Sequence, residues 1–172
     1  MDMLKKNFDV IILCGGYGKR LKPHTLKTPK PLLLVNNKPF VYFLIKKFLK
    51  LNVNNIYLAT GYKSSSFNIF LKKYFRLKSN IKIINSGKVD VIKRLQDSCK
   101  FIKNDFFVCY GDTYVNLNFR RYINFYLKNS FYATVVGAYY KIKYGLVEFD
   151  KSNFLIKKFI EKPLIKNPIN LG

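Results

Sequence analysis

The chain has 172 residues, 49% of them hydrophobic, so it can bury a core, and a disordered chain is excluded. Its 32 lysines and arginines against 9 aspartates and glutamates give a formal net charge of +23, which usually indicates nucleic acid or an anionic membrane as partner. We discount that inference, because Lys, Asn, Ile, Phe and Tyr are all in excess, as codons rich in A and T produce, and the lysines are scattered.

Three cysteines, Cys14, Cys99 and Cys109, are odd in number and lack the spacing of a metal site. This pattern favours reduced, mostly buried thiols. The apolar run at residues 10–14 is too short to span a membrane, and Asp9 beside it does not suit the core of a signal peptide. The sequence therefore predicts a cytoplasmic protein with no membrane partner.

Short apolar runs alternate with longer amphipathic runs along the chain. The short runs predict strands covered on both faces, at residues 8–14, 54–60, 80–85, 105–110 and 132–139. The amphipathic runs predict helices at residues 39–51, 64–77, 89–102 and 118–129, with Pro39 in a first turn and Asn118 as a cap. Residues 144–150 and 154–163 predict a hairpin that turns at residues 151–153.

This alternation predicts an α/β fold of three layers, α/β/α, around a mostly parallel, Rossmann-like sheet with right-handed crossovers and an appended hairpin. We expect one domain over residues 1–172. Polar segments follow four of the predicted strands, at residues 15–30, 60–63, 85–88 and 110–113. Because ligands bind outside the carboxyl ends of strands in open α/β sheets, these segments are the expected site.

The sequence GGYGKRL (residues 15–21) is the most informative of these segments. Glycines leave backbone N–H groups accessible to an anion, so a glycine turn behind a strand suits phosphate. The turn is not a P-loop, because Leu13 and Arg20 stand at the positions of its first glycine and last Ser or Thr. It is not the dinucleotide fingerprint either, because Leu21 replaces the third glycine.

Three motifs in this order, GGYGKRL, PKP (residues 29–31) and EKP (residues 161–163), resemble those of the sugar-1-phosphate nucleotidyltransferases. Smaller pieces are similar to the glucose-1-phosphate cytidylyltransferase-like branch: GYK (61–63), IKR (92–94), YGD (110–112) and IN-x-G (169–172). The resemblance implies the nucleotide-diphospho-sugar transferase fold. It also implies transfer of a nucleotidyl group from a nucleoside triphosphate to a sugar-1-phosphate, giving an NDP-sugar and pyrophosphate for polysaccharide precursors.

The resemblance also implies which residues bind the nucleotide. The backbone of Gly15, Gly16 and Gly18 would hold the triphosphate, and Lys19 adds a positive charge beside it. In the family this last position is usually Thr, so Lys19 is a departure that bears on triphosphate affinity.

Arg20 and Lys30 would neutralise charge as pyrophosphate leaves, since positioning and charge neutralisation supply most of the catalysis in such transfers. Asp112, at the carboxyl end of a predicted strand, would hold Mg²⁺, the implied cofactor. For the sugar-1-phosphate, Lys162 would bind the phosphate and Glu161 the hydroxyls, with Asn170 as a further substrate-binding residue.

Other functions stay open at this stage. Residues 85–95 lack a glycine pair that cytidylyltransferase-like members carry near the nucleotide base, and the chain is expected to lack the family's carboxyl-terminal segment with its second metal-binding Asp. One alternative is a catalytically impaired nucleotide-binding or regulatory homologue. Another is a basic nucleic-acid-binding protein, although the sequence has no recognisable module for it. A homo-oligomer is compatible with either.

Overall fold

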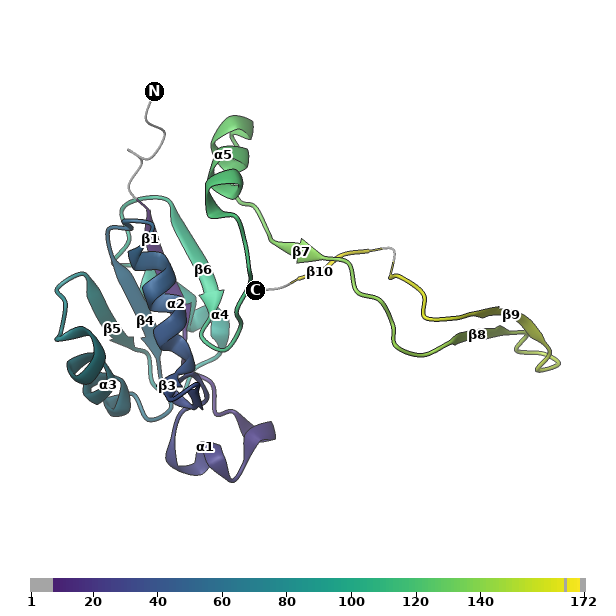
Figure 1. Cartoon of the computed structure of the whole chain (residues 1–172), viewed down its shortest axis with the longest axis horizontal. Coiled ribbons are helices and arrows are strands. Elements are labelled where there is room, and N and C mark those ends of the chain that lie inside the picture. The colour runs from purple at the N-terminus through teal and green to yellow at the C-terminus, as the bar shows by residue number, and fades with distance from the viewer. Residues whose placement is uncertain (1–7, 166, 171–172) are drawn as a thin grey trace. The chain divides into compact units, whose positions relative to one another are not determined.

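The computed structural model describes residues 8–165 and 167–170, and the chain divides into two compact units, residues 1–116 and 117–172. The first unit contains a four-stranded parallel sheet in the order β5-β4-β1-β6. Its strands are β1 (Asp9–Leu13), β4 (Ile56–Thr60), β5 (Ile81–Asn85) and β6 (Phe106–Tyr110) (Figure 1). The first four predicted strands are therefore confirmed.

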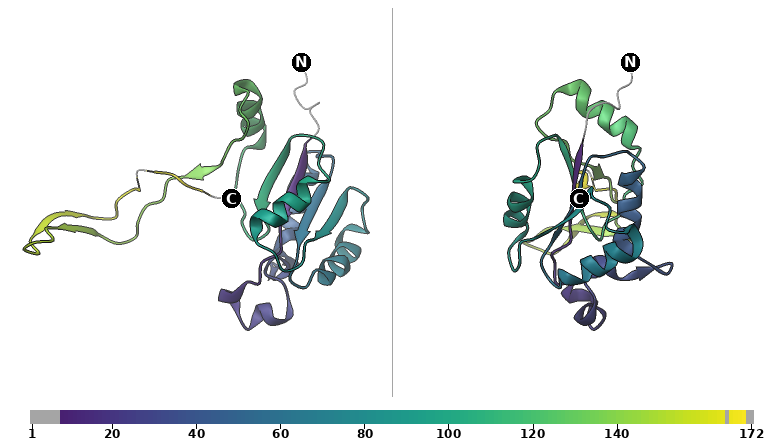
Figure 2. Two further views of the ribbon diagram at one scale, coloured as in Figure 1. Left: turned by 180° about the vertical axis from the view of Figure 1, so that it is seen from behind. Right: turned by 90° about the vertical axis from the view of Figure 1, so that its left-hand side faces the viewer.

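Three helices connect these strands: α2 (Phe40–Leu49), α3 (Ser65–Phe75) and α4 (Val91–Cys99). The chain moves from β1 to β4 to β5 in one direction and then returns past β1 to β6. Because crossovers are right-handed, α2 and α3 cover one face of the sheet and α4 covers the other (Figure 2). This arrangement confirms the three-layer prediction for the first unit.

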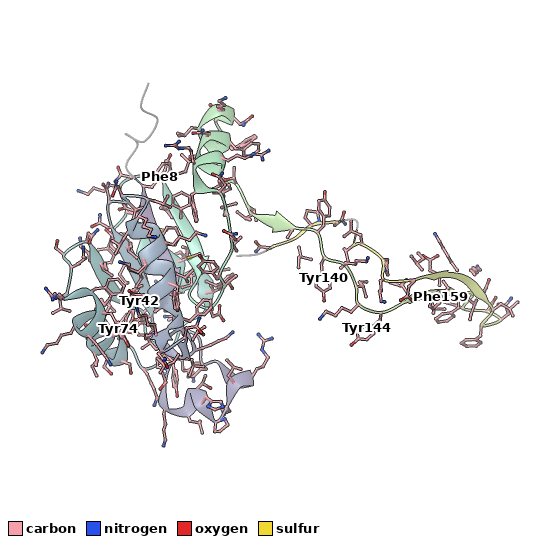
Figure 3. All side chains as sticks on the ribbon, in the orientation of Figure 1. Phe8, Tyr42, Tyr74, Tyr140, Tyr144 and Phe159 are labelled. Carbon is pink, nitrogen blue, oxygen red and sulfur yellow. The ribbon has the colours of Figure 1, made fainter. Side chains whose placement is uncertain are left out.

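The core lies between the sheet and its helices. All five β4 residues are buried, as are Val10, Ile11 and Ile12 of β1. Phe67 is the largest fully buried side chain, and α2 and α3 meet where the Tyr42 and Tyr74 rings lie 5.6 Å apart (Figure 3). On β6, which is an edge strand, Phe106 and Tyr110 remain about 40% exposed, so this strand is not covered on both faces as predicted.

The connection from β1 to α2 contains structure that the sequence pattern did not predict. It comprises η2 (Lys19–Leu21), α1 (His24–Lys27), η3 (Lys30–Leu32) and a small hairpin of β2 (Leu34–Val35) and β3 (Lys38–Pro39). Pro39 is the N-cap of α2, one position earlier than the first turn in which we expected it. These short turns place the glycine segment and Lys30 in one compact loop.

The second unit contains α5 (Phe119–Asn129), with Asn118 as its N-cap accepting a hydrogen bond from the Arg121 backbone N–H at 3.1 Å, as predicted. The predicted hairpin forms from β8 (Leu146–Phe149) and β9 (Ile156–Ile160), but as a separate two-stranded sheet. The prediction that residues 132–139 form a further strand of the parallel sheet is wrong. Only β7 (Gly137–Ala138) forms, and it pairs with β10 (Ile169–Asn170).

Side chains of the β8–β9 hairpin and the segment before it are largely exposed in this unit. Phe159 is 62% exposed and Tyr144 is 78% exposed (Figure 3). A two-stranded ribbon has two open faces, so its apolar residues lack the burial that the central strands have. No helix in the described residues is long and apolar enough to cross a membrane.

Candidate active site

A pocket of about 380 Å³ lies at the carboxyl ends of β1 and β6. It is lined by Leu13, Cys14, Gly15, Gly16, Tyr17, Gly18, Lys19, Arg20, Leu21, Lys30, Pro31, Val89, Val91, Arg94, Tyr110 and Asp112. The strand order reverses at β1, which is where ligands bind in open parallel sheets. The structure thus brings together seven of the residues that the resemblance singled out, all from the first unit.

The glycine turn follows β1 directly. At Gly18 both the backbone conformation and the close packing of Thr25 require glycine. Its φ of +61° is in the left-handed region, and an added β-carbon would lie 2.8 Å from Thr25 Cγ2. The buried Thr25 hydroxyl donates to the Gly18 carbonyl oxygen at 3.0 Å, which fixes this bend. Lys19 and Arg20 follow in η2, where both are exposed and border the pocket.

Gly16 differs from its neighbours because nothing lies within 4 Å of the position where its β-carbon would be. It is also exposed and lines the pocket. No packing within the described residues therefore requires glycine here. Close approach of a ligand to the backbone is the remaining physical reason for it.

Lys30 and Asp112 form an ion pair in the pocket, between the Lys30 Nζ and Asp112 Oδ2 atoms. Lys30 starts η3, and Asp112 follows β6 after Gly111. The two side chains are 33% and 32% exposed, so both remain accessible to a ligand. The expected leaving-group cation and the expected metal ligand are thus direct neighbours.

Asp112 suits Mg²⁺, which needs only one or two carboxylates when phosphate oxygens and water complete its coordination. Its side chain is partly exposed and lies at the carboxyl end of a strand beside the glycine turn. Among the described residues there is no group of three His, Cys, Asp or Glu that could hold a metal without such help. A metal at this place would therefore arrive with the phosphates of a ligand.

Arg94, the last residue of the IKR piece, for which no role was predicted, is a buried residue of the same pocket, 5% exposed. Its guanidinium donates to the carbonyl oxygens of Thr60, Gly87 (3.2 Å) and Val89 (3.0 Å). A β-carbon at Gly15 would overlap the guanidinium, so glycine is required there by Arg94. Burial lowers the pKa of Arg94, an effect that nearby Asp90 partly offsets.

The cysteines expected to be reduced are free thiols, and Cys14 is buried beside the pocket. Burial raises the pKa of Cys14 well above its usual value and raises the pKa of Cys109 to about 12. Both groups are therefore neutral thiols near neutral pH and are poor nucleophiles. They serve as packing groups under the site.

The predicted sugar-phosphate residues do not belong to the unit that contains this pocket. Glu161, Lys162 and Asn170 belong to the second unit. Glu161 and Lys162 are exposed and pair with each other at 3.4 Å, and Asn170 lies in β10. Gly172, the last residue of the IN-x-G piece, lies outside the described residues. The roles of these residues stay predictions.

The Nucleotidyl transferase family model matches residues 9–171 of this sequence, nearly its whole length. The chain belongs to the Nucleotidyl transferase family. This finding confirms the resemblance inferred from GGYGKRL, PKP and EKP. Among curated relatives, a mannose-1-phosphate guanyltransferase of Yarrowia lipolytica is 30% identical over 171 residues, which cover 94% of this chain and 47% of that protein. The chain thus spans about half the length of the curated relatives it matches.

Solved structures of the family share the fold. HddC from Yersinia pseudotuberculosis is 29% identical, with a TM-score of 0.72, over 96% of this chain and 74% of that chain. The same protein complexed with GMP-PN gives 28% identity and a TM-score of 0.68, over 90% of this chain and 69% of that chain. The α/β fold expected from the sequence is therefore confirmed.

Proposed function

We propose that this family member transfers a nucleotidyl group from a nucleoside triphosphate to a sugar-1-phosphate. The observation that carries the proposal is the convergence, in one pocket at the switch point of the sheet, of an open glycine turn, four cationic side chains and a carboxylate. A triphosphate needs N–H donors and cations, and the metal that accompanies it needs a carboxylate. The pocket offers all of these groups.

In the proposed reaction an oxygen of the sugar-1-phosphate attacks the α-phosphorus of the triphosphate. The bond from that phosphorus to the bridging oxygen of the β-phosphate breaks, and the electron pair leaves with pyrophosphate. Arg20 and Lys30 lie at the pocket to offset the charge that develops on the leaving group. Asp112 would hold Mg²⁺, which would supply positive charge to offset part of the charge of the phosphates.

Guanosine triphosphate and mannose 1-phosphate are the substrates that we propose first. The support is the name of the curated relatives, which are mannose-1-phosphate guanyltransferases. The match with HddC bound to GMP-PN agrees with a guanine nucleotide. Glu161, Lys162 and Asn170 remain the proposed sugar-phosphate residues, on the strength of the EKP and IN-x-G motifs.

The test is pyrophosphate release by the full chain with Mg²⁺, the four common nucleoside triphosphates and a panel of sugar-1-phosphates. We expect release that needs one triphosphate and one sugar phosphate, and a loss on the order of 10³-fold in Arg20→Ala, as for other cations in phosphoryl transfer. Asp112→Asn should abolish the Mg²⁺-dependent release of pyrophosphate. Glu148→Gln, which alters an exposed carboxylate on β8, is the matched control.

Other results would support the alternatives. Metal-dependent triphosphate binding without release across the panel would indicate a catalytically impaired nucleotide-binding homologue, and the lack of metal-dependent triphosphate binding would indicate a regulatory homologue. Binding to nucleic acid that falls steeply with salt and does not depend on Arg20 or Asp112 would indicate a nucleic-acid partner. A cytoplasmic location and a homo-oligomer stay predictions, which cell fractionation and sedimentation would test.

A further inference from the structure

Tyr62, in the loop that follows β4, contacts both ends of the segment that carries Lys19 and Arg20, which we call the cation loop (residues 15–27). Its backbone N–H donates to the Gly15 carbonyl oxygen at 3.4 Å, and the centre of its ring lies 5.0 Å from that of Tyr17. These contacts hold the start of the cation loop. The rest of the loop, with α1, extends beyond the carboxyl-terminal edge of the sheet (Figure 1).

The other end of the cation loop is α1, a helix of four residues. A helix this short is not stable by itself, and its last carbonyl groups have no partner within the helix. The Tyr62 hydroxyl shares its proton between the carbonyl oxygens of Thr25, at 3.0 Å, and Leu26, at 3.4 Å. Lys63 Nζ donates to the carbonyl oxygen of Lys27 at 3.2 Å. The loop after β4 therefore supplies hydrogen-bond donors to the end of α1.

Thr25 connects α1 to the glycine turn. Its side chain is 1% exposed, and its hydroxyl donates to the Gly18 carbonyl oxygen at 3.0 Å. Gly18 is the N-cap of η2, which contains Lys19 and Arg20. Contacts that fix α1 therefore also fix, through Thr25, the turn from which both exposed cations border the pocket.

We propose that Tyr62 is a positioning residue that holds Lys19 and Arg20 in place for the triphosphate by bridging the two ends of the cation loop, a role that rests on the proposed function for the identity of the ligand. The pocket lining in the described part of the chain does not include Tyr62, so this residue acts through the loop. Exposed lysine and arginine side chains lose conformational freedom when they bind an anion. A fixed backbone beneath them lowers that cost.

The test compares Tyr62→Phe with the unaltered full chain. The substitution removes the hydroxyl and keeps the ring against Tyr17. Titration calorimetry of GTP with Mg²⁺ should show an affinity about five-fold lower in Tyr62→Phe, as for the loss of one hydrogen bond. In a background of Lys19→Ala and Arg20→Ala, the same substitution should change the affinity by less than about two-fold, because the side chains that Tyr62 positions are absent.

Tyr57→Phe is the matched control. Tyr57 lies on β4, and its hydroxyl also donates to a backbone carbonyl oxygen, that of Phe101 at 3.0 Å. Neither residue lines the pocket in the described part of the chain. Loss of this hydrogen bond should lower stability and leave GTP affinity unchanged.

Limited proteolysis with trypsin gives a second measurement that needs no nucleotidyl transfer. Cleavage after Lys19 and Arg20 should be faster in Tyr62→Phe than in Tyr57→Phe, because proteases cut where the chain opens locally and the hydroxyl no longer holds α1. In the unaltered chain, GTP with Mg²⁺ should slow cleavage after these two residues, because both side chains then bind the triphosphate.

Unchanged GTP affinity in Tyr62→Phe would overturn the inference. So would an equal loss of affinity in the background that lacks both cations, because Tyr62 would then act through other groups. If Tyr62→Phe does not fold, a failure of GTP to protect the unaltered chain from trypsin would overturn it. Failure of the proposed function is distinguishable: it would show as an absence of nucleotidyl transfer while Tyr62→Phe still lowers GTP affinity.

Discussion

At the scale of single residues, positions 15 and 16 are adjacent in the pocket but require glycine for different reasons. We predict that Gly15→Ala lowers the free energy of unfolding by about 1–3 kcal/mol, because the new methyl group overlaps the buried Arg94 guanidinium. Gly16→Ala should leave stability within about 0.5 kcal/mol, because its methyl group meets no protein atom within 4 Å. Urea denaturation of the two variants checks this difference.

GTP binding by the Gly16→Ala variant tests the predicted role of Gly16 in binding the triphosphate. If the Gly16 backbone is approached by the triphosphate, Gly16→Ala weakens GTP binding although its stability is unchanged. A Gly16→Ala variant that binds GTP normally would contradict the assignment of Gly16 to the phosphate site.

The Lys30–Asp112 ion pair leads to a prediction about metal binding without nucleotide. The Lys30 ammonium is paired with the carboxylate that we assign to the metal. Lys30→Met should therefore tighten Mn²⁺ binding to the nucleotide-free protein about five-fold, which corresponds to ~1 kcal/mol, the upper range for an exposed pair. Electron paramagnetic resonance of free Mn²⁺ measures this, with Lys72→Met on α3 as control. Unchanged or weaker Mn²⁺ affinity would argue against Asp112 as the ligand.

The place of Arg94 in the pocket could not be predicted from the sequence. The glycine turn and Asp112 were predictable because each follows a strand and belongs to a short motif, and Lys30 was predictable from the PKP motif alone. Arg94 is one cation among 32, and its role depends on Gly15, Gly61 and Thr60, which are distant in sequence. An arginine on the apolar face of an amphipathic helix was the one signal that could have drawn attention to it.

At the scale of elements, α4 depends on its N-cap. The Asp90 carboxylate accepts a hydrogen bond from the Lys93 backbone N–H at 2.8 Å. We predict that Asp90→Ala lowers the free energy of unfolding by about 1 kcal/mol, as for other caps, and that Asp90→Asn retains most of the stability. Chemical denaturation checks both. Equal destabilisation by Ala and Asn would mean that the carboxylate charge, rather than the cap, is what matters.

The central strands of the parallel sheet were predictable because burial on both faces gives β1 and β4 continuous apolar runs. The same signal failed at residues 132–139, where apolar residues such as Tyr132 and Val135 are exposed and only Gly137–Ala138 pair with another strand. Apolar composition predicts a strand only where a neighbouring strand supplies hydrogen bonds. The turns between β1 and α2 have no periodicity and could not be predicted in this way.

At the scale of the whole molecule, the two units are expected to divide the substrates between them. The pocket proposed for the triphosphate belongs to the first unit, and Lys162 belongs to the second. We predict that Lys162→Ala raises the KM for the sugar-1-phosphate at least ten-fold and leaves GTP affinity unchanged, because a charged hydrogen bond contributes about 1.5–3 kcal/mol. Lys158→Ala on β9 is the matched control. A loss of GTP affinity in Lys162→Ala would contradict this division.

The buried thiol of Cys14 and the half-buried thiol of Cys109 make the stability of the folded chain depend on pH. Because burial raises the folded-state pKa of Cys14 and Cys109, the unfolded chain loses these protons at lower pH than the folded chain does. Stability from these groups is therefore fully present below about pH 8.5 and is lost as the pH rises above it. A thiol reagent at pH 8 should react slowly with both cysteines until denaturant is added. Rapid reaction of Cys14 in the native protein would contradict its burial.

The central claim is nucleotidyl transfer, and the most direct measurement follows an ¹⁸O label in the phosphate of mannose 1-phosphate. The full chain is incubated with labelled mannose 1-phosphate, GTP and Mg²⁺, and the products are analysed by mass spectrometry. Attack by the sugar phosphate on the α-phosphorus predicts GDP-mannose that retains all of the label and pyrophosphate that carries none. Label in the pyrophosphate, or hydrolysis of GTP without a labelled nucleotide sugar, would contradict the account.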